Sequence, residues 1–443
     1  MKTKTARHLA YDGLYAVFAK GAYSNLAMQQ ILRTKISPED RKFLTEIVYG
    51  TIRRMNVLVW YIGKISVRPV SELDKPVFIL LAMGLYQILF MNSVPDSAAV
   101  NETVEIAKKV THAGNAKFIN AILRNFLRKR EEIKMPTEAK TPILYESLLV
   151  NEPEWLVKRW RKAWGKEKAH AVFMAFNEVF PTDIRVNTRK ISVDAILKEL
   201  TDCGALPSRI SWCETGISVK NGGAFFRGDF LKSGKAYVQN RASMLPALVL
   251  SPGPGERVLD MCAAPGSKTT QMAEMMDDTG RIIAWDLYPH KVKLIQDNAK
   301  RLGISNIWAF EKDATISDSW YWETYDKVLL DAPCSGLGVI GRKPEIRWLR
   351  SAKELREFPK LQKKLIQAAG HYLKPGGILV YSTCTLEKEE NEDIVSSFLE
   401  TNDNFEALPF QIGELEAPSG MLTLWPDIHH CDGFFTAKLR RKS

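Results

Sequence analysis

The spacing of hydrophobic positions changes along this chain and divides it into regions. Over residues 1–130, apolar side chains recur every three or four positions, which is typical of amphipathic helices. This pattern predicts helices over residues 7–20, from 37 to about 54, 77–91, 95–109 and 117–130. No stretch there alternates as a strand would. We therefore expect the N-terminal third, residues 1–135, to be an all-helical domain.

The longest apolar stretch, residues 77–91, is interrupted by Gly84 and Gln87 and is too short to cross a bilayer. It predicts a buried helix. No apolar signal core follows the N-terminus, so we expect a cytoplasmic protein that does not contact a membrane.

A polar stretch over residues 131–145, with two prolines, reads as a linker. After it, a tryptophan-rich basic helix (152–164), a strand (180–188) and a helix (192–200) predict a small α+β subdomain over residues 146–245.

From residue 246 onward, short apolar runs alternate with helical patterns. Strands are predicted over 257–260, 280–286, 307–311, 325–330 and 376–385, with a final hairpin over 420–440. Strands that alternate with helices favour a doubly wound, Rossmann-like α/β domain with a parallel sheet, here residues 246–443. The fold class is therefore α/β, preceded by an all-α domain and a small α+β subdomain.

The stretch from Val258 to Thr270 carries the clearest binding signal. A short strand ends at Asp260, a turn of small residues follows, and a helix begins near Ser267, which we expect to be its N-cap. Such a turn lets a ligand lie against the backbone and offers it unpaired N–H groups. The stretch contains neither of the usual phosphate-loop patterns, G-x-x-x-x-G-K-S/T and G-x-G-x-x-G.

Acidic residues follow four of the predicted strands: Asp260, Asp286, Asp313 and Asp331. Open α/β sheets bind ligands at the carboxyl ends of their strands. An acid after the second strand suits ribose hydroxyls, and one after the third suits an adenine amino group. A single carboxylate at a strand end often only faces solvent or caps a turn, whereas four in phase with four strands favour a ligand site.

Two of the six cysteines, Cys334 and Cys384, fall at the ends of predicted adjacent strands. No pair has C-x-x-C spacing, so we expect no metal. A single such cysteine is more often a buried small hydrophobe than a nucleophile. Together, the two are placed to flank one substrate base.

The string Cys262-Ala-Ala-Pro-Gly-Ser-Lys268, with the Pro-Cys and Thr-Cys pairs, resembles the RNA cytosine-C5 methyltransferases. The resemblance implies S-adenosylmethionine as cofactor, Cys384 as the nucleophile that attacks carbon 6 of cytosine, and Cys334 as the residue that assists product release. It implies cofactor contacts by Cys262, Ala263, Ala264, Pro265, Gly266, Ser267, Lys268, Asp286, Asp313 and Asp331. Whether Asp331 serves the cofactor or the cytosine edge stays open.

The strings 99–108 and 117–123 resemble the NusB family of RNA-binding helical domains. The charge distribution agrees with an RNA partner, because residues 1–140 hold 22 Lys and Arg against 12 Asp and Glu while the whole chain has a net charge of +11. A NusB-like domain joined to this core resembles the family members that methylate a cytosine of 16S ribosomal RNA, and we expect a monomer.

Basic and polar residues outside the motifs are candidate RNA contacts, namely Arg185, Asn187, Arg189, Arg342, Lys343 and Arg347. Three alternatives remain at this point. They are the same chemistry on transfer RNA or another RNA, a non-enzymatic RNA-binding assembly factor, and a nucleotide-dependent oxidoreductase. The last is disfavoured because its glycine fingerprint is missing.

Overall fold

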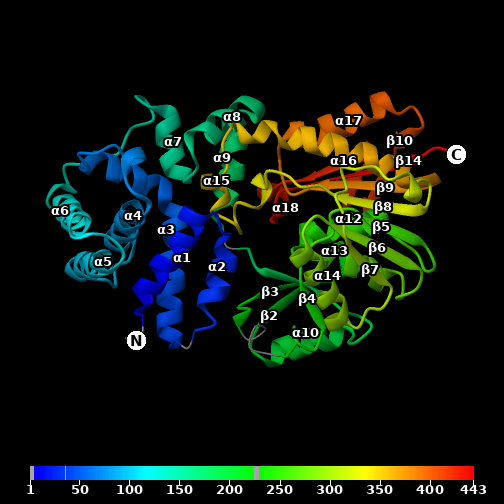
Figure 1. The fold of residues 1–443 in the computed structure, drawn as a ribbon, viewed down its shortest axis with the longest axis horizontal. Helices are drawn as coiled ribbons and strands as arrows, with labels where there is room; N and C mark the ends of the chain where they lie inside the picture. Colours follow the sequence, from blue (N-terminus) through cyan, green and yellow to red (C-terminus); the bar gives the residue numbers. More distant parts are fainter. Residues whose placement is uncertain (1–3, 35, 179, 224–228) are drawn as a thin grey trace. The chain divides into compact units, whose positions relative to one another are not determined.

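The chain folds into two compact units that interleave along the sequence (Figure 1). The computed structural model describes residues 4–34, 36–178, 180–223 and 229–443. One unit comprises Met1–Asn177 together with Ile340–Ala352, and the other comprises Glu178–Val339 and Lys353–Ser443. The chain therefore leaves the second unit after Val339, contributes thirteen residues to the first, and returns at Lys353.

The first unit is helical, as predicted. It begins with α1 (Ala6–Lys20), α2 (Ser24–Ile31), α3 (Pro38–Ile65), α4 (Lys75–Phe90), α5 (Asp96–Val110) and α6 (Ala113–Lys129). The sequence pattern missed α2, which has only eight residues and lacks a side-chain cap. Helix α3 is capped by Ser37 and runs well past the predicted end near Arg54.

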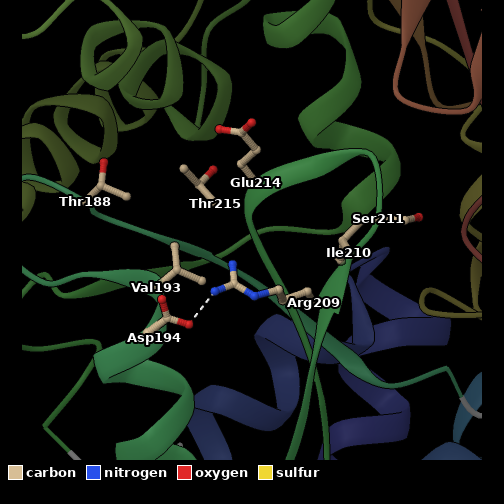
Figure 2. A pocket seen from close by; sticks show the side chains of 8 residues that line it. All are labelled: Thr188, Val193, Asp194, Arg209, Ile210, Ser211, Glu214 and Thr215. Carbon is tan, nitrogen blue, oxygen red and sulfur yellow. Dashed lines mark hydrogen bonds and ion pairs between the residues drawn. The ribbon is translucent and has the colours of Figure 1, made fainter.

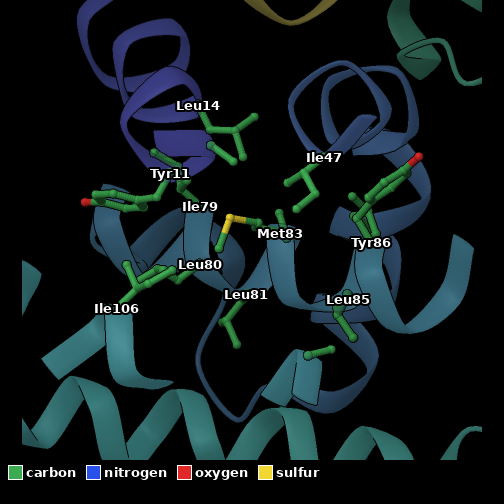
Figure 3. Packing of buried hydrophobic residues seen from close by; sticks show 14 of the residues in the cluster. Tyr11, Leu14, Ile47, Ile79, Leu80, Leu81, Met83, Leu85, Tyr86 and Ile106 are labelled. Atoms are coloured by element: carbon green, nitrogen blue, oxygen red, sulfur yellow. The ribbon is translucent and has the colours of Figure 1, made fainter. Parts of the chain in front are cut away.

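Helix α4 forms the centre of this unit. Its residues from Ile79 to Gln87 are all buried, in agreement with the apolar stretch. Figure 3 shows Leu80 and Met83 of α4 among side chains from α1, α3 and α5, including Leu14, Ile47 and Ile106. Each such buried side chain contributes about 1.5–3 kcal/mol of hydrophobic stabilisation. None of the helices in the described ranges combines the length and apolar character that a bilayer crossing requires.

The same unit continues with α7 (Pro142–Val150), α8 (Glu154–Trp164) and α9 (Lys166–Ala175) and includes the short α15 (Ile346–Leu349). Trp160 of α8 stacks on Phe173 of α9 with ring centroids 4.9 Å apart. By contacts these helices belong with the N-terminal ones, although the sequence pattern placed residues 146–177 in the second domain.

A four-stranded antiparallel sheet opens the second unit. Its strand order is β2-β3-β1-β4, from β1 (Thr182–Val186), β2 (Leu206–Ile210), β3 (Cys213–Lys220) and β4 (Ala236–Val238). Helix α10 (Val193–Asp202) packs Ile196 and Leu200 against Ile184 and Ile217 of this sheet. The predicted small α+β region is therefore present.

The large sheet of the second unit has the strand order β10-β14-β9-β8-β5-β6-β7, and β13 (Met421–Leu424) pairs with β14. Its parallel strands are β5 (Arg257–Asp260), β6 (Arg281–Asp286), β7 (Ile307–Glu311), β8 (Tyr325–Asp331) and β9 (Leu373–Thr383). Antiparallel edge strands β14 (Phe434–Arg441) and β10 (Phe405–Ala407) follow. The doubly wound prediction and the adjacency of the fourth and fifth strands are confirmed.

Helices cover both faces of this sheet (Figure 1). One face carries α12 (Arg241–Leu250), α13 (Ser267–Met275) and α14 (Pro289–Leu302). The other face carries α16 (Phe358–Tyr372) and α17 (Glu392–Thr401). A small hairpin of β11 (Phe410–Ile412) and β12 (Leu415–Ala417) and the short α18 (Pro426–His429) complete the unit.

Candidate active site

The turn between β5 and α13 depends on one glycine. Gly266 has φ 93°, a left-handed conformation that side chains rarely adopt, and it is the N-cap of α13. A Cβ there would approach the backbone of Ile295 in α14 to 3.2 Å, so glycine also permits close helix packing. Ser267 is the first helical residue and makes no capping bond, so the prediction of Ser267 as N-cap was wrong.

A cavity of about 610 Å³ opens at the carboxyl ends of the parallel strands and extends to α16. Three of the predicted cofactor residues line it: Cys262 follows β5, Asp286 is the last residue of β6, and Asp313 follows β7. The strand-end rule therefore located this wall of the cavity from the sequence.

Two carboxylates of the cavity are held in place by local hydrogen bonds. Asp286 accepts from the backbone N–H groups of Ala264 and Tyr288, each at 3.3 Å. Asp313 accepts from the hydroxyl and the backbone N–H of Thr315 at 2.6 and 2.9 Å, and these bonds lower the pKa of the Asp313 carboxyl. Ionised Asp313 therefore presents a fixed hydrogen-bond acceptor.

Lys268 and Asp331 lie beside the cavity rather than among its lining residues. Nζ of Lys268 donates to Oδ2 of Asp331, and Oγ of Ser382 donates to Oδ1. The ammonium of Lys268 also lies 5.2 Å from the ring centroid of Phe434. The ion pair links the first turn of α13 to β8, and the Ser382 hydrogen bond extends the link to β9.

The other predicted cofactor residues shape the loop and the start of α13 through backbone contacts. They are Ala263, Ala264, Pro265, Gly266 and Ser267. The N–H of Ala263 donates to the carbonyl of Trp285, and the carbonyl of Pro265 accepts from Asn298. These residues are not among those that line the cavity, so their predicted contact with a cofactor stays a prediction.

The two candidate cysteines meet at the ends of β8 and β9. Their Sγ atoms lie 3.3 Å apart, within hydrogen-bond reach for sulfur. The parallel register that pairs Asp331 with Ser382 brings them together. The bond to Cys384, reinforced by burial and by the negative charges of Glu390 and Asp331, raises the pKa of Cys334 well above the ordinary thiol value. Either sulfur can be the donor, so the two thiols share one hydrogen bond.

Two of the residues that the sequence suggested as RNA contacts form hydrogen bonds inside the protein instead. Arg185 is buried and donates to Glu274, to Gln239 and to the carbonyl of Ser267. Asn187 is also buried and donates to the carbonyls of Gly234 and Leu302. The prediction was wrong for these two because a buried side chain with this many partners cannot face RNA.

Arg347 is a further correction. Its guanidinium is 1% exposed, lies 3.2 Å from the carboxylate of the fully buried Glu152 and donates to the carbonyl of Asn151 at 3.0 Å. The neighbouring Glu345 accepts from both the N–H and the hydroxyl of Ser24. Residues 340–352 therefore form an internal part of the helical unit around these two side chains, and Arg347 is no phosphate contact.

Sequence reasoning missed much of the cavity wall. Leu287 and Tyr288 follow Asp286 directly and are about half exposed despite their apolar character, which was an available signal. Residues of α16 line the opposite side, and their helical spacing looked like ordinary amphipathicity. The lining residues that were missed include Lys291, Lys312, Lys360, Leu361, Lys364 and Leu365.

A second, polar pocket of about 430 Å³ lies by the small sheet (Figure 2). The side chains of Asp194 and Arg209 pair across it, with Thr188 and Glu214 nearby. It holds none of the predicted site residues. Within the described ranges, no group of three or more His, Cys, Asp and Glu side chains is arranged to hold a metal ion.

A Rossmann-like sheet with a cavity and acidic residues at the ends of successive strands is the architecture of nucleotide-binding enzymes, and the family match identifies this one as a methyltransferase. Family comparisons agree with this class. Residues 247–440 match the family described as 16S rRNA methyltransferase RsmB/F, residues 4–128 match the NusB family, and residues 152–225 match a ferredoxin-like domain of the RsmF/B type.

The chain belongs to the RsmB/F family of methyltransferases. It is 33% identical to the probable ribosomal RNA small subunit methyltransferase B of Bacillus subtilis, over the full length of both chains. The crystal structure of PH0851 superposes with a TM-score of 0.87 at 28% identity and covers 99% of each chain. NSun6 from Pyrococcus horikoshii with SFG gives a TM-score of 0.58 at 25% identity, covering 66% of this chain and 98% of that one.

Proposed function

We propose that this protein transfers a methyl group from S-adenosylmethionine to carbon 5 of a cytosine in 16S ribosomal RNA, through a covalent bond between Cys384 and carbon 6. The observation that carries the proposal is the 3.3 Å separation of the Cys334 and Cys384 sulfurs next to the strand-end cavity. Pro333, which directly precedes Cys334, lines that cavity. Methyl donor and nucleophile would therefore meet at one edge of the sheet.

The residues present suit the cofactor. A cavity of about 610 Å³ is within the usual range of roughly 300–1,000 Å³ for small-ligand sites. Asp286 and Asp313 would accept hydrogen bonds from ribose hydroxyls and from the adenine amino group, and the half-exposed Leu287 and Tyr288 offer apolar surface for a flat ring. When bound, the cofactor supplies an electrophilic methyl group on a sulfonium.

Carbon 5 of cytosine is a poor nucleophile, and the chain's cysteines overcome this. The Cys384 thiolate forms a bond to carbon 6, and the displaced electron pair makes carbon 5 nucleophilic toward the methyl group. Methyl transfer would leave S-adenosylhomocysteine. A base then takes the carbon 5 proton, the electron pair of that C–H bond re-forms the double bond between carbons 5 and 6, and the bond to sulfur breaks to release the Cys384 thiolate. Cys334, whose Sγ lies 3.3 Å from that of Cys384, would assist the release of the methylated product.

An RNA substrate is supported by the helical unit and by charge. The NusB match covers residues 4–128, and the basic excess lies in the same third of the sequence. The relative from Bacillus subtilis has ribosomal RNA of the small subunit in its name, which favours 16S rRNA here. Because carbon 5 and carbon 6 are stacked in a helix, the target cytosine has to be unstacked before both sulfurs can reach it.

The test incubates wild type, Cys384→Ala and Cys334→Ala with S-adenosylmethionine and unmodified 16S rRNA. We expect 5-methylcytosine from the wild type, no product and no adduct from Cys384→Ala, and covalent RNA–protein adduct on a denaturing gel from Cys334→Ala. Cys203→Ala is the matched control, because it removes an exposed cysteine far from Cys334 and Cys384 in the sequence, and it should behave as wild type.

Reversed behaviour of the two variants would contradict the assignment of the cysteine roles. Methylation of transfer RNA but not of 16S rRNA would contradict the substrate. A wild type that transfers no methyl group to any RNA would contradict the proposed function as a whole.

A further inference from the structure

Glu390 is an acidic side chain buried directly behind the cysteine pair. It ends the single turn η5 (Lys388–Glu390), which connects β9 to α17, and is 1% exposed. Burying a carboxylate is costly unless hydrogen bonds replace its hydration. Burial raises the pKa of Glu390, while bonds from Ser335, Gln362 and Thr385 act in the opposite direction.

The partners of Glu390 are the residues that immediately follow the two cysteines. Its Oε2 accepts from the backbone N–H of Ser335 at 2.9 Å, and its Oε1 accepts from the hydroxyl of Thr385 at 3.4 Å. In addition, the side-chain hydroxyls of Ser335 and Thr385 lie 2.8 Å apart, within hydrogen-bond distance. One carboxylate therefore bridges the loop after Cys334 to the loop after Cys384.

Further bonds fix the carboxylate itself. The side-chain amide of Gln362, on α16, donates to Oε2 of Glu390 and also to the carbonyl of Pro333. The hydroxyl of Tyr381, on β9, donates to the backbone carbonyl of Glu390 at 2.6 Å. The bridge is thereby anchored to both elements that flank it.

The next residue along the chain, Asn391, holds the other side of Cys384. It accepts from the hydroxyl of Thr383 and donates to the carbonyl of Thr385 at 3.0 Å. The side chain of Asn391 thus fixes Thr383 and Thr385, the two sequence neighbours of Cys384.

Glu390 does not line the cofactor cavity, and its hydrogen-bond partners lie in the loops after the two cysteines, on β9 and on α16. We propose that Glu390 is a positioning residue, acting as a hydrogen-bond acceptor that holds the Cys334 and Cys384 loops in register. The inference rests on the proposed cysteine mechanism. Because catalysis is sensitive to displacements of about 1 Å, releasing this bridge should slow the chemical step.

The experiment compares Glu390→Ala, Glu390→Gln and Glu389→Ala with wild type. Alanine removes the acceptor, whereas glutamine keeps one acceptor oxygen for Ser335 and Gln362 and removes the charge. Glu389→Ala changes the exposed neighbour in the same turn and is the control. We measure kcat and KM for methyl transfer to 16S rRNA, the Kd for S-adenosylmethionine, and the thermal unfolding midpoint.

We expect Glu390→Ala to lower kcat at least tenfold while both the KM for RNA and the Kd for S-adenosylmethionine change less than threefold. Glu390→Gln should restore kcat to within about threefold of wild type, because the bridge needs an acceptor rather than a charge. If Glu390→Ala fails to fold, the folded Glu390→Gln variant decides, and activity within threefold of wild type supports the inference.

A Glu390→Ala variant with the kcat of Glu389→Ala would overturn the inference. So would a folded Glu390→Gln variant that stays inactive, because that result would assign the effect to the charge. Inactivity of the wild type on every RNA is a separate result, since it contradicts the proposed function itself.

Discussion

The ammonium of Lys268 lies 2.6 Å from Oδ2 of Asp331. Lys268 is the second residue of α13, directly after the turn that follows β5, and Asp331 is the last residue of β8, three positions before Cys334. The lysine side chain is 9% exposed, so water screens this pair only weakly. One ion pair therefore ties the first turn of α13, next to the proposed cofactor turn, to the strand that leads to Cys334.

Replacing Lys268 with methionine keeps much of the side-chain volume and removes the charge. We expect the Kd for S-adenosylmethionine to rise at least tenfold, because the start of α13 loses its link to β8. We also expect the free energy of unfolding to fall by about 1–3 kcal/mol, because Asp331 loses a partner. Isothermal titration calorimetry and chemical denaturation measure the two effects. Lys293→Met, at an exposed site on α14, is the control, and an unchanged Kd for Lys268→Met would show that the ion pair does not support the cofactor turn.

Asp260 makes stability depend on pH. Burial is the main cause that raises the pKa of Asp260 from its ordinary 3.8 to about 7, although Thr269 donates a hydrogen bond to it. Its Oδ1 has no hydrogen-bond partner among the described residues. Because the folded state binds this proton more tightly than the unfolded state, the stabilising contribution is complete below about pH 4 and is lost as the pH rises through 7.

Asp260→Asn should remove this dependence while keeping an acceptor for Thr269. The unfolding free energy of wild type minus that of Asp260→Asn is expected to fall by roughly 2–3 kcal/mol between pH 5 and pH 8. Urea denaturation at several pH values measures it. Asp297→Asn on the exposed face of α14 is the control, and a difference that stays constant with pH would show that Asp260 titrates normally.

The buried pair of Arg347 and Glu152 should hold residues 340–352 within the helical unit. Above pH 8, where Glu152 is ionised, Arg347→Met leaves its carboxylate buried without a cation, which typically costs about 3–5 kcal/mol. Adding Glu152→Gln should recover at least half of that loss, because it removes the uncompensated charge. Hydrogen exchange in α8 and α15 measures the local stability.

Lys108→Met, which breaks an exposed pair with Glu105 in the same unit, should change stability by less than about 0.5 kcal/mol. If Arg347→Met behaved like this control, the pair would be too weakly coupled to retain the segment. At a pH below 5 the effect of Arg347→Met should shrink, because burial raises the pKa of Glu152 to about 7 and the carboxyl is then protonated in the folded state.

The elements that carry the site follow from local patterns. Helix α4 was predicted because its apolar residues are contiguous, and strands β5 to β9 because short apolar runs alternate with helices. The convergence of Asp286 and Asp313 on one cavity also followed from sequence, because parallel strands end at the same edge of a sheet.

Only the tertiary structure decided which charged residues are internal. Arg185 pairs with Glu274, and Arg347 pairs with Glu152 about two hundred positions away. Sequence position does not reveal such partners, because burial of a charge is stable only when distant segments bring its counter-charge. The same holds for α16 as a wall of the cavity and for the 3.3 Å between Cys334 and Cys384. Periodicity and strand ends are local properties of the sequence, whereas these contacts depend on how β8, β9 and their loops pack.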